Sequence, residues 1–180
     1  MEIPGLGSFT KDTHSGWLVS DPVQVPVIGG RMCQFLVKGY EGDSRREEFH
    51  AAIVNFLSAS PSVLKEVEPH LFQYYRDCCE GLEPEDFEDL GITELQSPAD
   101  VWQYVRLGND PLVTRRAYGD HGIYVSVECG CDWEQEHGLQ IIFKDGLRVN
   151  KIGPYDGHVT NSDAYGDDPL ENVIYRQVRA

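Results

Sequence analysis

Two periods of hydrophobic residues divide the chain into strand-like ends and a helical middle. Residues 1–40 contain short β-branched runs interrupted by glycine and proline, which is typical of strands joined by tight turns. Gly29-Gly30 lies between two of these runs, 23–28 and 33–37, and both glycines accept a positive φ without steric cost. This region is predicted to form an antiparallel hairpin.

The middle of the chain, residues 44–108, has the apolar spacing of three or four helices. Apolar residues recur every three or four positions between 49 and 57, which places them on one helical face. Ser44 and Glu47 have the spacing of a capping box, in which the two side chains satisfy each other's backbone N–H groups. A helix is therefore predicted over about 45–58.

Prolines mark the remaining helices of this block. Ser60-Pro61 begins a helical stretch that runs to about residue 79, and Pro69 inside it is expected to kink or split the helix. One short helix fits residues 84–90. Ser97-Pro98 begins a last helix, which is predicted to end at Gly108.

The C-terminal part alternates between apolar and polar residues as strands do. Four strands are predicted, over 112–118, 123–129, 138–144 and 147–152. Asp145-Gly146 joins the last two as a two-residue hairpin turn. The predicted fold is a single α+β domain, with central helices packed on a mainly antiparallel sheet formed by the N-terminal hairpin and a C-terminal β-meander. Its predicted parts are N-terminal strands in 1–40, helices in 44–108, strands in 112–160 and a tail in 161–180.

The net charge of the chain limits the classes of molecule that it can bind. The 180 residues include 30 Asp plus Glu and 15 Lys plus Arg, for a formal net charge of −15. Such a surface repels the phosphates of nucleic acids and of anionic membranes. We therefore expect neither nucleic acid nor membrane as a partner.

The chain is predicted to be a cytoplasmic protein. Its longest apolar runs, such as 141–143, are far shorter than the roughly 18 residues of a membrane span. The N-terminus has neither the basic region nor the apolar stretch of a secretion signal. Five cysteines, an odd number, favour reduced thiols over a disulfide framework.

The negative charge is concentrated in one segment. Residues 66–100 contain eleven acidic residues and one basic residue, Arg76. Within 80–94 there are seven acidic residues and no basic one. We predict that this segment binds a basic protein partner, through Glu83, Glu85, Asp86, Glu88 and Asp89.

A second polar cluster surrounds Trp133, in residues 128–138. In one extended strand, alternate side chains point to opposite faces, so cysteines and Trp133 would share one face and the carboxylates the other. The cysteines and Trp133 can then be core residues of a strand. Alternatively, the cluster is a binding surface formed by Trp133, Glu134, Glu136 and His137.

The same cluster allows a metal alternative. Cys129, Cys131 and His137 are residue types that bind zinc, with Asp132 or Glu136 as a fourth ligand. However, Cys-x-Cys is a poorer zinc motif than Cys-x-x-Cys, and no second cysteine pair lies at the usual distance. No cofactor is therefore expected, with zinc as the alternative.

Catalytic motifs give little support to an enzyme. The chain contains no Gly-x-Ser-x-Gly, His-Glu-x-x-His or phosphate-binding Gly-x-x-x-x-Gly-Lys-Ser/Thr sequence. His137 with Glu134 or Glu136 has the composition of a general base and its orienting partner, although a histidine beside a glycine is more often a turn residue. No catalytic residue is assigned.

The tract from Cys129 to Leu139, with Ile141–Phe143, Asp145-Gly146 and Tyr155–His158 after it, resembles a group of small bacterial proteins of uncharacterised function. Members share a Trp-Glu-x-Glu-His-Gly-Leu sequence that leads into a strand and a tight turn. Comparable domains are sometimes labelled immunity proteins of toxin systems. The resemblance implies a short cytoplasmic single-domain protein and assigns no catalytic residues.

Two functions follow from these observations. The first is a protein-binding module, similar to an immunity protein, whose acidic surface binds a basic partner. The second is a metal-binding protein or metal-dependent enzyme that uses Cys129, Cys131 and His137.

Overall fold

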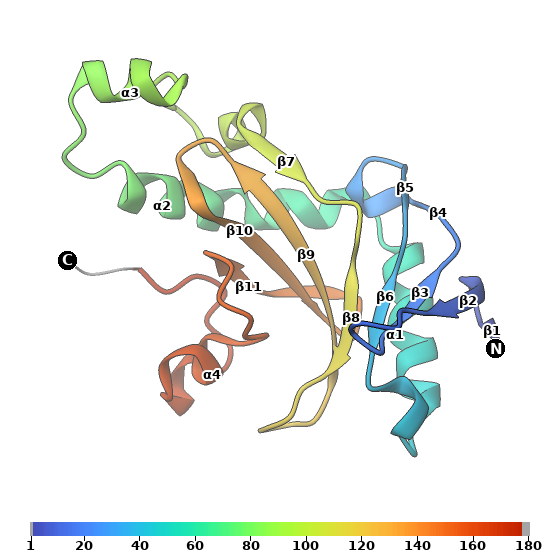
Figure 1. The fold of residues 1–180 in the computed structure, drawn as a ribbon. Helices are drawn as coiled ribbons and strands as arrows, with labels where there is room; N and C mark the ends of the chain where they lie inside the picture. Colours follow the sequence, from blue (N-terminus) through green and yellow to red (C-terminus); the bar gives the residue numbers. More distant parts are fainter. Residues whose placement is uncertain (1, 178–180) are drawn as a thin grey trace.

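A large, mainly antiparallel sheet forms the centre of the protein in a computed structural model that describes residues 2–177 (Figure 1). Its strand order is β1-β2-β3-β6-β8-β9-β10-β11, and β7 pairs with β9 beside this path. Strands β4 and β5 form a separate two-stranded sheet. The strands are β1 (Glu2–Ile3), β2 (Gly7–Lys11), β3 (Leu18–Ser20), β4 (Val23–Val25), β5 (Arg31–Cys33), β6 (Leu36–Lys38), β7 (Val105–Leu107), β8 (Leu112–Arg115), β9 (Ile123–Cys131), β10 (Glu134–Lys144) and β11 (Arg148–Gly153).

The N-terminal and C-terminal strands meet at a parallel pair, β6 with β8, so the predicted sheet from both ends of the chain is confirmed. The helices are α1 (Arg46–Ser58), α2 (Glu68–Cys78), α3 (Pro84–Leu90) and α4 (Asn161–Tyr165), with short 3₁₀ helices η1 (Pro26–Ile28), η2 (Tyr40–Gly42), η3 (Pro61–Val67), η4 (Pro98–Gln103) and η5 (Asp168–Leu170). None of the helices within residues 2–177 is long and apolar enough to cross a lipid bilayer.

Chain reversals lie at both predicted glycine turns, but neither is a two-residue hairpin turn: Val25 pairs with Arg31 across residues 26–30, and Lys144 pairs with Arg148 across residues 145–147. Gly29 and Gly30 have φ of 80° and 69° between the paired strands β4 and β5. The strands are shorter than predicted, because Pro26 begins η1 where the first run continues. Asp145 and Gly146 have φ of 53° and 69°, and a Cβ on Gly146 would lie 2.0 Å from the Ala52 carbonyl oxygen of α1, so this turn requires glycine.

Of two predicted helix boundaries, the start of α1 changes and the break at Pro69 is confirmed. The predicted Ser44–Glu47 capping box is wrong: α1 begins one residue later, with Arg45 as N-cap, and the Arg45 amide donates to Asp43 Oδ1 at 2.8 Å. The predicted split at Pro69 is confirmed, because η3 ends at Val67 and Pro69 lies in the first turn of α2.

The predicted helix from 98 to 108 is wrong in its second half. Residues 98–103 form η4, with the predicted Ser97 capping box, but Val105–Leu107 form strand β7 and pair with β9. A Cβ on Gly108 would lie 2.0 Å from the Glu128 carbonyl oxygen. Close approach to β9 therefore explains this glycine, which the sequence suggested as a helix end.

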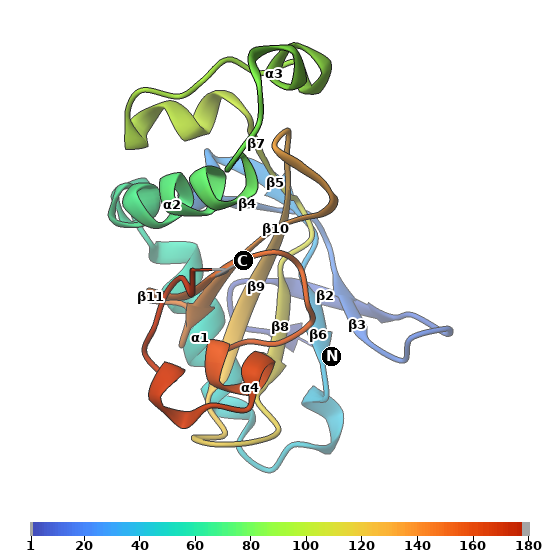
Figure 2. The same cartoon turned by 90° about the vertical axis from the view of Figure 1, so that its left-hand side faces the viewer.

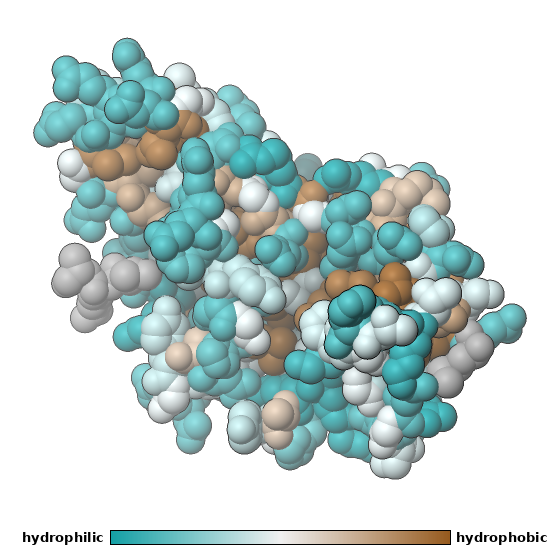
Figure 3. Space-filling model, in the orientation of Figure 1, coloured by the Kyte–Doolittle hydropathy of each residue, from teal (hydrophilic) through white to brown (hydrophobic). Residues whose placement is uncertain are grey.

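Helices α1 and α2 cover one face of the sheet (Figure 2), whereas α3 projects beyond it at the end of the molecule shown at upper left in Figures 1 and 3. The predicted helix 84–90 is confirmed as α3, which buries none of its own residues. It is therefore not part of the helical layer.

The predicted tail, 161–180, contains α4 and η5 and lies at the β11 edge of the sheet (Figure 1). The Ile152 N–H donates to the Ile174 carbonyl at 2.7 Å, which satisfies a backbone group of this edge strand. The last three residues of the predicted tail lie outside the described residues.

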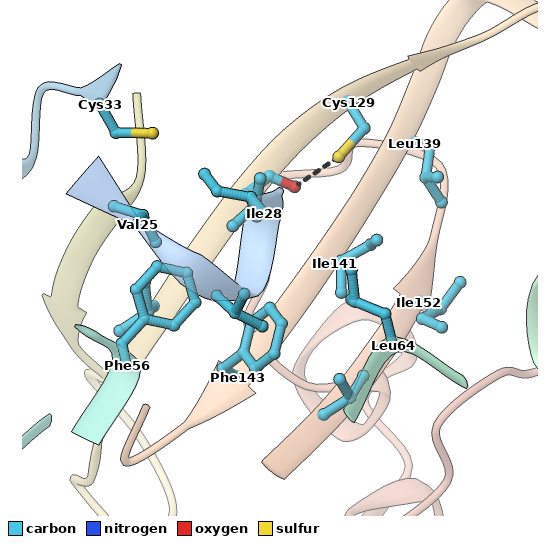
Figure 4. Close-up of a cluster of buried hydrophobic side chains, with 14 of the residues drawn as sticks. Val25, Ile28, Cys33, Phe56, Leu64, Cys129, Leu139, Ile141, Phe143 and Ile152 are labelled. Carbon is cyan, nitrogen blue, oxygen red and sulfur yellow. Dashed lines mark hydrogen bonds between the residues drawn. The ribbon is translucent and has the colours of Figure 1, made fainter. Parts of the chain in front are cut away.

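The core lies between the sheet and α1–α2. Phe56 of α1 meets Phe143 of β10 edge-on, with ring centroids 5.0 Å apart (Figure 4). The predicted apolar face of α1 is confirmed, because Phe49, Ala52, Ile53 and Phe56 are buried.

Candidate functional site

Trp133 lies in the hydrophobic core and does not form part of a binding surface. It is 4% exposed and packs edge-on against Tyr74 and Tyr75 of α2, with ring centroids 6.2 and 5.8 Å away. Asp132 and Trp133 form the turn between β9 and β10. The chain reverses at this turn, so 128–138 is not one extended strand; the two strands predicted on either side, 123–129 and 138–144, extend further toward the turn as β9 and β10.

Glu134 binds backbone amides. Its Oε1 accepts hydrogen bonds from the amides of Glu136 and His137 at 2.9 and 3.0 Å. His137 Nδ1 lies 3.7 Å from the same oxygen, and its side chain is 55% exposed. Glu134 thus holds the start of β10 in shape, while His137 and Glu136 remain at the surface.

The zinc alternative is not supported by the positions of its ligands. Cys129 and Cys131 are buried on the core side of β9, and desolvation raises the pKa of each thiol to about 12. Cys129 Sγ donates to the Val127 carbonyl (Figure 4), whereas His137 is exposed. Residues 2–177 contain no group of three or more His, Cys, Asp or Glu side chains that could hold a metal ion.

A groove of about 580 Å³ contains the exposed members of the Trp133 cluster. Glu128, Glu136 and His137 line it together with the rings of Trp17 and Tyr155. Asp132, expected beside Glu128, instead pairs with Arg106 at its rim. The groove thus has mixed charge and two aromatic walls, but only part of the predicted row of carboxylates.

Ser126, which lines this groove, is hydrogen-bonded within the sheet. Its hydroxyl is 3.0 Å from Gln140 Nε2, which donates to it. Histidine makes no hydrogen bond to Ser126 in the described part of the chain. Ser126 and Gln140 are both buried, and their hydrogen bond joins β9 to β10.

A buried charge network that the sequence did not indicate lies at the other end of the sheet. The Arg116 side chain is 4% exposed. Its Nε donates to Asp163 Oδ2 at 2.7 Å, and its Nη2 donates to Glu171 Oε2 at 2.9 Å. Hydrogen bonds from this guanidinium lower the pKa of both carboxyls, so Arg116 holds the C-terminal segment to the sheet.

The acidic projection is defined as residues 80–94. Hydrogen bonds at its C-terminal end join it to the rest of the domain. The Tyr75 hydroxyl accepts a hydrogen bond from the Leu95 amide at 3.0 Å, and the Tyr104 hydroxyl accepts one from the Thr93 amide at 3.0 Å. Gly91, with φ of 69°, ends α3 between these anchors and the helix. The projection therefore has a defined position.

All seven carboxylates of the acidic projection are exposed. None of them forms an ion pair with a lysine, arginine or histidine in residues 2–177. The predicted contact residues Glu83, Glu85, Asp86, Glu88 and Asp89 lie together on α3 and its N-cap. The structure thus brings this predicted set together, with its charge unneutralised.

An apolar hollow lies within the acidic projection. It has a volume of about 380 Å³ and is lined by Leu82, Pro84, Phe87, Ile92 and Thr93, with Glu88 and Glu94. Figure 3 shows hydrophobic side chains exposed at this end of the molecule, bordered by hydrophilic ones. Sequence reasoning missed the hollow, because its apolar residues follow neither a helical nor a strand period.

Comparison with known proteins gives one family match. A family model described as a domain of unknown function (DUF6985) matches residues 5–159. No curated protein and no solved structure gives a significant match to the chain. Asp163 and Glu171, the partners of Arg116, lie beyond the matched residues.

Proposed function

The chain belongs to this family of domains of unknown function, and we propose that it is a protein-binding module whose acidic projection binds a basic protein, as an immunity protein binds a toxin. The observation that carries the proposal is the set of seven exposed carboxylates with no basic partner among the described residues. Elsewhere, buried or half-buried carboxylates such as Asp163 and Asp43 are paired with arginines.

The negative charge of the projection favours a protein as its partner over a nucleic acid or an anionic membrane. Unpaired carboxylates on a projecting helix create a negative potential that accelerates encounter with a cationic surface. The same potential repels nucleic acids and anionic membranes. We also place the protein in the cytoplasm, where its five cysteines, all free in the structure, stay reduced.

A charge-matched pair of variants tests the proposal. One variant neutralises the projection, with Glu85→Gln, Glu88→Gln and Asp89→Asn. The other neutralises exposed carboxylates elsewhere, with Asp21→Asn, Glu66→Gln and Asp110→Asn. Both carry the same net charge, so any difference between them reports position.

The probe is a helical peptide of lysine and alanine, the Lys/Ala peptide, and its binding is measured by fluorescence anisotropy over a range of salt concentrations. Neutralising the projection should weaken binding about tenfold at low salt, because each exposed charge contributes a few tenths of a kcal/mol or more. The control should bind within about twofold of wild type. Equal weakening in both variants would refute the proposal.

A further inference from the structure

We infer that the partner segment which docks on the acidic projection is an amphipathic basic helix, which inserts a bulky apolar side chain into the hollow beside Phe87. This inference rests on the proposed function and specifies the chemistry of its partner. The hollow and the carboxylates belong to one surface, because Glu88 and Glu94 line the hollow itself.

The shape of the hollow favours a side chain over a free small molecule. Its volume of about 380 Å³ is at the low end of the roughly 300–1,000 Å³ of small-molecule sites. Apolar side chains dominate its lining, and Phe87 and Leu82 are only half-buried. A leucine or phenylalanine from a partner would cover this exposed apolar surface.

The charges around the hollow determine which residue types the partner segment must carry beside its apolar anchor. Glu88 and Glu94 lie at the hollow, while Glu85 and Asp89 extend the negative surface along α3. A partner must therefore present lysine or arginine next to its apolar anchor. An amphipathic helix does so directly, since residues three and four apart share a face.

The same charges disfavour a second copy of this chain as the occupant. Two acidic projections face to face would bring fourteen unpaired carboxylates together, twice the seven of each chain, and like charges disfavour such a contact. Self-association would leave the hollow occupied without a basic partner, so sedimentation serves as its test.

Two peptides separate the contribution of the apolar anchor to the binding affinity from the contribution of charge. The Lys/Leu peptide carries the lysines of the Lys/Ala peptide and adds one row of leucines along a helical face. If the hollow takes an anchor, the Lys/Leu peptide should bind about tenfold or more tightly than the Lys/Ala peptide, because a leucine side chain is removed from water.

Two variants act on the hollow in opposite ways, so that misfolding of one does not decide the result. Phe87→Ala removes its aromatic wall. Thr93→Trp fills it, keeping the hydrogen bond of the Thr93 backbone amide to Tyr104 and removing that of the Thr93 hydroxyl. Both should lower the affinity for the Lys/Leu peptide to that for the Lys/Ala peptide. Leu147→Ala, at an exposed apolar residue far along the chain, should change neither affinity.

The outcomes are distinguishable. Equal affinity for the two peptides, with both weakened by neutralising the projection, would overturn the anchor and leave the proposed function standing. If neutralising the projection affects neither peptide, the proposed function fails first. Concentration-dependent self-association in sedimentation, abolished by Phe87→Ala, would assign the hollow to a second copy and overturn the inference.

Discussion

The backbone N–H of Glu83 donates a hydrogen bond to Asp86 Oδ2 at 2.7 Å and thereby caps the N-terminus of α3. The Glu83 side chain belongs to the same capping box, so two carboxylates of the acidic projection have structural contacts. Their neighbours Glu85, Glu88 and Asp89 have no ion-pair partner among the described residues. This difference separates residues that shape the projection from those proposed to bind.

Asp86→Ala should destabilise α3 locally. Loss of a capping side chain costs about 1 kcal/mol, and α3 buries none of its residues, so the free energy of global unfolding should hardly change. Hydrogen exchange of the α3 amides should become about fivefold faster, whereas Glu85→Gln should leave it unchanged. Unaltered exchange in Asp86→Ala would show that the cap is unimportant.

Substitutions at Trp133 test its assignment to the core. Trp133→Ala should lower the free energy of unfolding by about 3–5 kcal/mol, because it leaves a cavity against Tyr74 and Tyr75. Trp133→Phe should cost less than Trp133→Ala, because it keeps an aromatic ring in the core and the buried indole Nε1 has no hydrogen-bond partner to lose. Urea denaturation measures both. A stable Trp133→Ala that loses peptide binding would instead support a contact role.

Removal of the Arg116 side chain should destabilise the protein strongly. Arg116→Met leaves Asp163 and Glu171 without their guanidinium, and breaking a buried ion pair from one side costs about 3 kcal/mol. Urea denaturation at neutral pH measures the loss. Asp167→Asn, at an exposed carboxylate nearby, is the control and should change little.

The same network predicts a dependence of stability on pH. Hydrogen bonds from Arg116 lower the folded pKa of Asp163 and Glu171, so their contribution is complete above the unfolded pKa of about 4 and is lost as the pH falls through the folded values. Wild type should lose stability from about pH 5 to pH 3. Arg116→Met should show a smaller slope, and an equal slope would place the titrating groups elsewhere.

Thiol reactivity tests the placement of the cysteines. Burial raises the pKa of Cys129 and Cys131 to about 12, and the thiolate is the reactive form. A disulfide reagent at pH 8 should label both only after unfolding, and EDTA should leave the melting temperature unchanged. Rapid labelling in the folded protein would contradict the burial of these cysteines, and a fall in melting temperature with EDTA would restore the zinc alternative.

Local patterns predicted the elements whose signals lie within a few residues. The apolar stripe of α1, the break at Pro69 and the Asp145-Gly146 turn all follow from short-range spacing. Strand β7 does not follow from short-range spacing, because it pairs with β9, more than twenty residues later in the chain. Its own sequence continues the helical pattern of η4.

The position of the candidate site along the chain could be predicted from the sequence, but the apolar hollow within it could not. Seven acidic residues without a base identify the projection from sequence alone. The hollow depends on how the chain returns at Gly91 to bring Ile92 near Phe87, and the Arg116 network joins residues about fifty positions apart. Both are products of tertiary structure.

Hydrogen exchange of the whole protein with and without the Lys/Leu peptide locates the bound peptide without any substitution. If the acidic projection binds the peptide, exchange should slow in residues 80–94 and in the adjoining end of α2, with little change elsewhere. Protection confined to the groove lined by Trp17 and Tyr155, or none at saturating peptide, would contradict binding at the projection.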